Sequence, residues 1–193
     1  MDIKTYIQDS IDTKTRILND ESILEGIKKI ADRIVEAYRL DKKVLTAGNG
    51  GSAGDAQHIA GELVSKFFFD RPGLSAFSLT TDTSILTAIG NDYGYEKTFS
   101  RQIQANAKEG DIFIGISTSG NSKNIVLALE EAKKKRVITV GFVGSEECEM
   151  DKWCDYIIHV PSASTPTIQE SHIMIGHIIC ALVEEAIFNK AGV

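Results

Sequence analysis

Two side chains that can exchange protons or bind a metal occur four residues apart. His58 and Glu62 lie in a stretch that is expected to be helical, where a spacing of four places both on one face. An imidazole beside a carboxylate can act in general acid–base catalysis or ligate a transition metal. A pair at this spacing is also common as a simple surface contact, so its meaning depends on what surrounds it.

A glycine-rich turn just before this pair is suited to binding an anion. Residues 44–47 form a short apolar run, typical of a buried strand, and Gly-Asn-Gly-Gly follows at residues 48–51. Glycine permits positive φ angles and a close approach of the backbone to a ligand. Ser52 stands where a helix N-cap is expected, with the helix running from Ala53. Free N–H groups at such a helix start attract phosphate.

A second turn, at residues 117–122, indicates phosphate binding more specifically than the first. Its sequence, Ser-Thr-Ser-Gly-Asn-Ser, places four hydroxyl groups between an apolar strand and a helix, which suits a phosphate monoester. The Walker pattern, with its lysine, is absent. The first turn meets the relaxed dinucleotide pattern G-x-G-x-x-A, but the next strand ends without an acid for a ribose. We therefore favour a phosphorylated small molecule, and a polar turn without a ligand is the alternative.

A third candidate, His177, lies in a mostly apolar run near the carboxyl end of the chain. A histidine of the hydrophobic core is the ordinary explanation for such a position. Helical phase would pair His177 with Glu170, seven residues earlier, rather than with Gln169. The residues alone thus indicate His58, Glu62 and His177 as candidates for chemistry and leave a fourth group open.

The elements that must position these residues alternate between strands and helices, which predicts βαβ units and a parallel sheet. Strands are expected at residues 44–47, 74–79, 111–116, 137–143 and 156–160. Helices are expected twice within 3–38, with a break at Asn19 and Asp20, then from 53, at 85–89, 95–107, 123–136 and 168–189, with a further break at 90–94. Whether the first two helices pack on this sheet or on a neighbouring subunit is left open. Ligands of such sheets bind beyond the carboxyl ends of the strands, where both turns lie.

Composition limits the class of protein. A length of 193 residues favours one domain, and a net charge of −6 argues against a nucleic-acid groove. We expect no signal peptide and no membrane span, since no apolar run approaches the required length. Three cysteines without a Cys-x-x-Cys pair favour a reduced, cytoplasmic protein.

These motifs resemble the sugar isomerase (SIS) domain family and, within it, the phosphoheptose isomerases. The serine-rich turn alone indicates only a SIS domain, whereas the pairs His58/Glu62 and Gln169/His177 narrow the resemblance to sedoheptulose 7-phosphate isomerases. The matching stretches are residues 47–52, 55–58 with 62–63, 90–94, 115–122 and 168–177.

The resemblance implies an α/β fold: a five-stranded parallel sheet flanked by helices, doubly wound as in flavodoxin. It implies a single SIS domain over residues 1–193, in which 1–40 form an N-terminal helical extension used in oligomer packing. Members assemble as homotetramers with active sites at subunit contacts. The implied reaction converts sedoheptulose 7-phosphate to D-glycero-D-manno-heptose 7-phosphate through an enediol and feeds heptose synthesis for surface polysaccharide.

The resemblance also assigns roles to residues. Glu62 and His177 match the proton-transfer residues, a carboxylate base that can return its proton and a second acid or base for the oxygens. A zinc ion, Zn(2+), which would polarise the carbonyl, is implied at His58, Glu62, Gln169 and His177. Asn49 supplies the only side-chain amide of the glycine turn. The implied substrate contacts are Asn49, Gly50, Gly51, Ser52, Glu62, Lys66, Asn91, Asp92, Ser117, Thr118, Ser119, Ser122 and Gln169.

Two departures from the family pattern concern the substrate. Lys66 stands where these isomerases usually have an arginine. A lysine keeps the positive charge but cannot donate the paired hydrogen bonds of a guanidinium group. Residues 162–167 lack the charged side chains often found before the final helix. One alternative is therefore a protein that isomerises or senses another phosphosugar. The other is a non-catalytic SIS module that binds a replication initiator protein, which would not need both Glu62 and His177.

Overall fold

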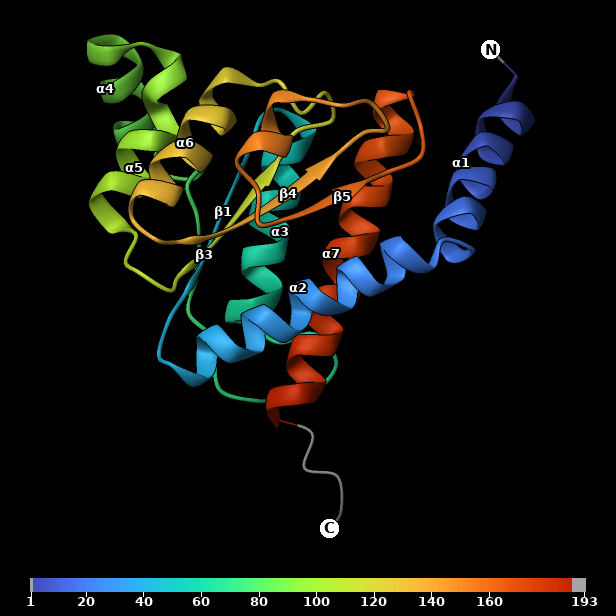
Figure 1. Cartoon of the computed structure of the whole chain (residues 1–193), viewed down its shortest axis with the longest axis horizontal. Helices are drawn as coiled ribbons and strands as arrows, with labels where there is room; N and C mark the ends of the chain where they lie inside the picture. Colours follow the sequence, from blue (N-terminus) through green and yellow to red (C-terminus); the bar gives the residue numbers. More distant parts are fainter. Residues whose placement is uncertain (1, 189–193) are drawn as a thin grey trace.

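Five short strands form one parallel sheet in the computed structural model, which describes residues 2–188 (Figure 1). Neighbouring strands pair in the order β2-β1-β3-β4-β5, the doubly wound order of flavodoxin-like folds, which confirms the expected fold class. The order reverses at β1, whose neighbours β2 and β3 both follow it in sequence. The strands are β1 Val44–Gly48, β2 Ala76–Ser78, β3 Ile112–Ile116, β4 Ile138–Val143 and β5 Tyr156–His159.

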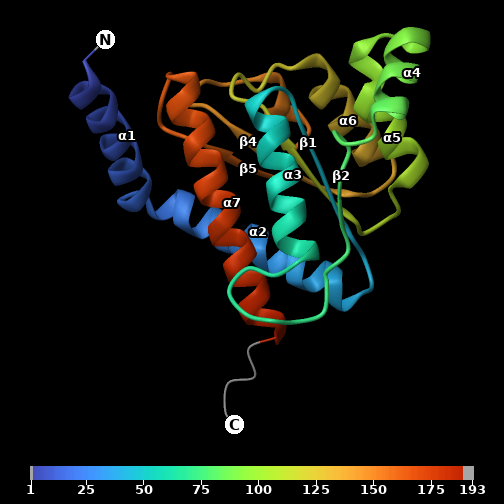
Figure 2. The same cartoon turned by 180° about the vertical axis from the view of Figure 1, so that it is seen from behind.

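One face of the sheet is covered by α2 (Glu21–Arg39), α3 (Gly51–Val64) and α7 (Thr165–Phe188), with α3 and α7 side by side (Figure 2). The isoleucines of α2 recur every three or four residues and are buried in the core on this face. This helix therefore packs on its own sheet, which the sequence left open. By contrast, α1 (Ile3–Leu18) extends away from the sheet, and its Ile3, Ile7 and Ile11 are exposed.

The opposite face carries α4 (Thr83–Tyr93), the 3-10 turn η1 (Tyr95–Lys97), α5 (Thr98–Asn106) and α6 (Lys123–Lys134) (Figure 1). A second apolar cluster fills this side, in which helix residues pack against Leu45 and Phe113 of the central strands. A second 3-10 turn, η2 (Glu149–Lys152), lies between β4 and β5. Because both faces are covered, every residue of β1 and β3 is buried, as their apolar sequences predicted.

Several element boundaries differ from the expectations. The expected N-cap at Ser52 is wrong, because Gly50 caps α3 with φ at 55° and lets the helix begin at Gly51. The expected break at residues 90–94 is also wrong except at its end, since α4 runs through Gly90 and only Gly94 adopts a positive φ, of 87°. Strand β2 is shorter than expected, and α7 begins earlier, at Thr165. The expected end of α7 at Asn189 lies outside the described residues.

The last helix, α7, is long and apolar enough to cross a membrane by length and composition, which the sequence analysis did not anticipate. Of its most apolar window, 44% is buried inside the structure. The helix packs against both α2 and α3, and its buried residues include Ile175, Ile179 and Val183. This packing is that of a core helix in a soluble fold.

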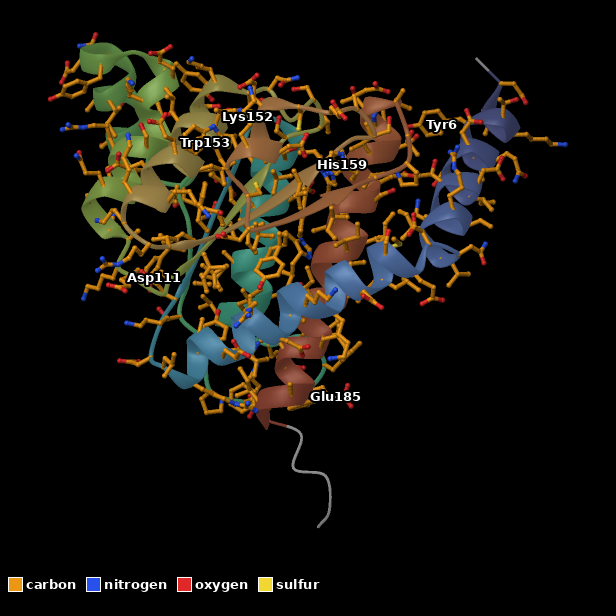
Figure 3. The ribbon with its side chains drawn as sticks, in the orientation of Figure 1. Tyr6, Asp111, Lys152, Trp153, His159 and Glu185 are labelled. Atoms are coloured by element: carbon orange, nitrogen blue, oxygen red, sulfur yellow. The ribbon has the colours of Figure 1, made fainter. Side chains whose placement is uncertain are left out.

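A buried ion pair joins the amino ends of β1 and β3, away from the turns at the carboxyl ends. Asp111, labelled in Figure 3, is 1% exposed and accepts hydrogen bonds from the backbone N–H groups of Lys43 and Lys108. Its other strong partner is the Lys43 ammonium, at 2.5 Å. These bonds fix the register of the two central strands at the end of the sheet opposite the two turns.

We expect Asp111→Ala to lower the free energy of unfolding by about 2 kcal/mol, since two backbone N–H groups and a partly buried ammonium lose a buried acceptor. Urea denaturation measures the loss. The matched control is Glu109→Ala, which breaks only an exposed ion pair with Arg136 and is expected to change little. An Asp111→Ala protein as stable as the wild type would show that this junction does not hold the sheet.

Candidate functional site

The glycine turn and the serine turn leave β1 and β3 side by side, at the point where the strand order reverses. This is the position at which open α/β sheets bind ligands. The glycine turn is tight, because a Cβ atom at Gly48 would lie 2.3 Å from the backbone oxygen of Ser52. Ser52 itself is in the first turn of α3 and is 6% exposed. Its N–H and those around it lie at a helix start that favours an anion.

Hydroxyl groups line the serine turn and bond to one another. Ser117 is 4% exposed, and its Oγ lies 2.9 Å from that of Ser122, the residue that precedes α6. The Ser119 hydroxyl accepts the N–H of Asn121 at 3.2 Å. Gly120 closes the turn with φ at 64°, and a Cβ there would collide with the Cys148 sulfur. The turn thus presents several hydroxyl groups and a second helix start at one edge of the sheet.

The packing of α3 on α7 brings the three candidates for chemistry together. His58 Nε2 lies 3.1 Å from Glu62 Oε1 and 3.0 Å from His177 Nε2. All three ligand atoms are within 4.8 Å of one another. His177 is therefore not an isolated core histidine, and the group forms a half-open cluster in which the Glu62 side chain is 25% exposed.

The cluster has the chemistry of a metal site. One Nε2 atom carries either one hydrogen or one lone pair, so His58 cannot satisfy both neighbours at once. A cation between the three atoms would accept a lone pair from each. Tetrahedral zinc with Zn–N bonds of about 2.0–2.1 Å sets its ligand atoms roughly 3.3 Å apart. The distances from His58 Nε2 to Glu62 and to His177, 3.1 and 3.0 Å, are close to this value. The nitrogen and oxygen donors fit zinc.

Gln169, at the start of α7, is held by a residue that the sequence analysis missed. Its Nε2 donates to Asp55 Oδ1 at 2.5 Å. Because a carboxylate only accepts, the amide oxygen of Gln169 remains available as a ligand. Asp55 is 5% exposed, and its Oδ2 has no hydrogen-bond partner among the described residues. Burial raises the pKa of Asp55 to about 6, although the bond from Gln169 and the nearby His58 oppose the shift.

The pairing of His177 with Glu170 that helical phase suggested does not form. Glu170 faces α1, where it accepts hydrogen bonds from Ser10 and from the Lys14 ammonium, the latter at 2.8 Å. Helical phase identifies a shared face of one helix, but it does not say which neighbouring helix a side chain meets. The neighbour here is α1 for Glu170 and α3 for His177.

Other expected substrate contacts lie at positions that are more exposed than the two turns. Asn91 and Asp92, at the end of α4, hydrogen-bond to each other at 2.8 Å, and both are exposed. Lys66 is exposed just after α3. The Asn49 carboxamide bonds to Asn124 and to the Tyr95 hydroxyl, two residues that the sequence analysis did not identify.

A buried ion pair locks the end of α3, where Glu62 lies, to α7. The Arg71 guanidinium bonds to the Glu62 and Leu63 carbonyls and, at 2.9 Å, to the Glu184 carboxylate. Glu184 is 0% exposed and also accepts the backbone N–H groups of residues 67–69. The Phe67 ring in turn lies 5.7 Å from that of His177. The Arg71–Glu184 pair therefore sets the relative position of the two helices that carry the cluster.

The sheet order, the two polar turns and the cluster on α3 and α7 define a SIS domain, and residues 5–144 match the model of that family. The chain is 65% identical over 188 residues to a phosphoheptose isomerase of Aneurinibacillus thermoaerophilus, across 97% of this chain and 95% of that relative. It is 60% identical to phosphoheptose isomerase 2 of Campylobacter jejuni, across 97% and 94%. A phosphoheptose isomerase structure from Francisella tularensis matches with a TM-score of 0.91 and 34% identity, over 95% of this chain and 96% of that one. The chain belongs to the phosphoheptose isomerase family.

We expect Glu184→Gln to lower the free energy of unfolding at pH 7 and to flatten its dependence on pH below about 5. Burial alone would raise the pKa of Glu184, but the N–H groups of residues 67–69 and Arg71 outweigh it and hold the pKa below its usual range. The charged form therefore stabilises the fold above the unfolded pKa of about 4.3, and this contribution disappears as the pH falls through the folded value.

Urea denaturation at pH 3.5, 5 and 7 measures the effect. Glu147→Gln is the control, because this carboxylate is exposed. It should retain the wild-type pH dependence. Equal losses in the two variants would show that Glu184 has no special role.

Proposed function

We propose that this protein is an aldose–ketose isomerase that converts sedoheptulose 7-phosphate to D-glycero-D-manno-heptose 7-phosphate. The observation that carries the proposal is the meeting of Glu62 and His177, from distant parts of the chain, in one cluster with His58. Relatives that share about 60% of the sequence over nearly the whole chain are named phosphoheptose isomerases. A carboxylate and an imidazole are the groups that a proton transfer between adjacent carbons requires.

The reaction moves one proton between two carbons and one between two oxygens. Glu62 removes a proton from C1 of the ketose, and the C–H electrons form the C1=C2 bond of the enediol while the carbonyl oxygen at C2 gains a proton. Return of the proton from Glu62 to C2, with loss of the O1 proton, gives the aldehyde. His177 transfers protons to and from the oxygens at C1 and C2, because an imidazole can both give and accept a proton near neutral pH.

The phosphate is held at the other end of the substrate, by the two turns. In this assignment Gly50 and Gly51 offer backbone N–H groups, and Ser52 and the serine turn offer hydroxyl groups. Binding energy gained at the phosphate, away from the reacting carbons, positions C1 and C2 at the cluster. We assign the phosphate to Ser52, Ser117, Thr118, Ser119 and Ser122, and sugar contacts to Lys66, Asn91, Asp92 and Gln169.

The four zinc ligands in this proposal are His58, Glu62, Gln169 and His177. The donor atoms of three already converge, and the amide oxygen of Gln169 is the end left free by Asp55. When bound, zinc would supply Lewis-acid stabilisation of the negative charge that develops on the substrate oxygens.

The same proposal includes a cytoplasmic homotetramer with active sites at subunit contacts. Helix α1 supports it, because Ile3, Ile7 and Ile11 are 76%, 54% and 50% exposed on a helix that extends from the rest of the fold. An apolar stripe of this kind is normally covered by another subunit. A second copy of this chain is the partner we assign to it.

Purified protein is expected to convert sedoheptulose 7-phosphate to the aldose, and Glu62→Gln is expected to lower kcat by about 10³-fold, since the amide cannot accept the C1 proton. NMR of the reaction mixture identifies the product. Light scattering checks that the assembly is unchanged.

The matched control is Glu25→Gln, an exposed carboxylate on α2, which should retain full activity. Full activity in Glu62→Gln would remove its role in proton transfer. A wild-type protein that binds but does not isomerise this sugar would favour the non-catalytic SIS module, and turnover of a different phosphosugar would point to the substitution at Lys66.

Removal of metal with a chelator is expected to lower activity, and added zinc should restore it. His58→Ala should bind zinc more weakly, because it removes one of the converging donors. Calorimetric titration and metal content measure zinc binding directly. His159→Ala, outside the cluster, is the control and should bind zinc normally. Indifference to chelation, with no zinc bound, would leave His58 and Gln169 as substrate contacts only.

A further inference from the structure

The side chain of Asn49 is the centre of a hydrogen-bond network at the glycine turn. Its Nδ2 donates to Asn124 Oδ1 at 2.9 Å, and its Oδ1 accepts from Asn124 Nδ2, also at 2.9 Å. The two carboxamides thus form a reciprocal pair. The Tyr95 hydroxyl donates to the same Asn49 oxygen at 2.8 Å.

Each partner in the network belongs to a different segment of the site. Asn49 lies within the glycine turn, between Gly48 and Gly50, and Asn124 is the second residue of α6, just past the serine turn. Tyr95 begins η1, three residues after Asp92. The three segments to which we assign substrate contacts are therefore tied together through one carboxamide.

The hydrogen-bonding capacity of Asn49 is almost fully used. A carboxamide oxygen accepts two hydrogen bonds and its nitrogen donates two. Asn124 and Tyr95 occupy both positions on the oxygen, and Asn124 occupies one on the nitrogen. The oxygen is thus unavailable to a sugar hydroxyl, although the resemblance implied that this amide contacts the substrate.

Burial shows that the pair is part of the scaffold. Asn124 is 3% exposed, so its carboxamide would be left unsatisfied if Asn49 were absent. Tyr95, by contrast, is 63% exposed and reaches Asn49 from the surface. The network has a buried half, which joins the two turns, and an exposed half, which adds the segment after α4.

We propose that Asn49, Asn124 and Tyr95 are positioning residues that hold the two phosphate-binding turns at a fixed separation. The inference rests on the proposed function in one respect, that these turns bind the substrate phosphate. Turns that are already held at a fixed separation lose little conformational entropy when the phosphate binds, and this raises the affinity. The cluster of Glu62 and His177 lies on α3 and α7 and is not part of the network. Loss of the network should therefore affect the chemical step less than it affects phosphate binding.

Asn49→Ala and Asn124→Ala are each expected to raise KM for the sugar phosphate about tenfold and to change kcat less than about threefold. The inhibition constant for inorganic phosphate should rise in parallel. Because either change breaks the same pair, the double variant should be no worse than the weaker-binding single variant. Asn106→Ala is the control and should leave KM unchanged, because this asparagine is exposed on α5 and its side chain bonds to the Gln102 carbonyl of its own helix.

Tyr95→Phe keeps the test valid if the buried variants do not fold, because its ring is exposed. It should raise KM and the phosphate inhibition constant about threefold without a change in Tm. Unchanged phosphate affinity in folded Asn124→Ala and in Tyr95→Phe would overturn the proposal, as would additive effects in the double variant.

Failure of the proposed function is a separate outcome. If the wild-type protein does not isomerise the sugar, calorimetric binding of inorganic phosphate to the wild type and to the same variants still tests the network. Weaker phosphate binding in the variants would support it, and equal binding would overturn it.

Discussion

The close packing of α3 against α7 is the contact on which the site depends. A Cβ atom at Gly176 would lie 2.7 Å from the Ile59 side chain, so the helices approach more closely there than a larger residue would allow. Gly176 directly precedes His177, and Ile59 directly follows His58. The two helices are therefore tightly packed next to the two imidazoles, and a wider separation would part their nitrogen atoms.

The order of the strands explains why a second half of the site meets this helix pair. The chain leaves β1 toward α3 on one face of the sheet and leaves β3 toward α6 on the other. The turns at the ends of these neighbouring strands consequently lead to opposite faces, which is the position at which open α/β sheets bind ligands. Two helices start there, one after Gly50 and one after Ser122. The anion site and the acid–base cluster share α3, which begins at the first and carries half of the second.

The sequence was sufficient for the fold class because apolar periodicity and turn residues are local signals. Four of the five strands lie within the predicted runs, and β1 extends one residue beyond its run, to Gly48. It was sufficient for His58 and Glu62 because both are on one helix. Residue spacing alone did not identify Gln169, which only the family resemblance named, since the direction in which a side chain of α7 points depends on whether α1 or α3 covers that part of the helix. The N-cap at Ser52 was wrong for a similar reason: residue type favours serine there, but the positive φ of Gly50 starts the helix earlier.

The residues that the sequence did not reveal have a common property, since Asp55, Asn124 and Glu184 are polar but almost fully buried. Each bonds to a different part of the site: to Gln169, to the glycine turn, and to the segment between Glu62 and the next strand. A buried polar group is costly unless it is paired, so each of these groups favours only the arrangement in which its partners are in place. The exposed groups to which we assign substrate contacts have fewer neighbours to hold them. Their geometry is set by these buried partners, whose pairing is a long-range property of the fold and leaves no pattern in neighbouring residues.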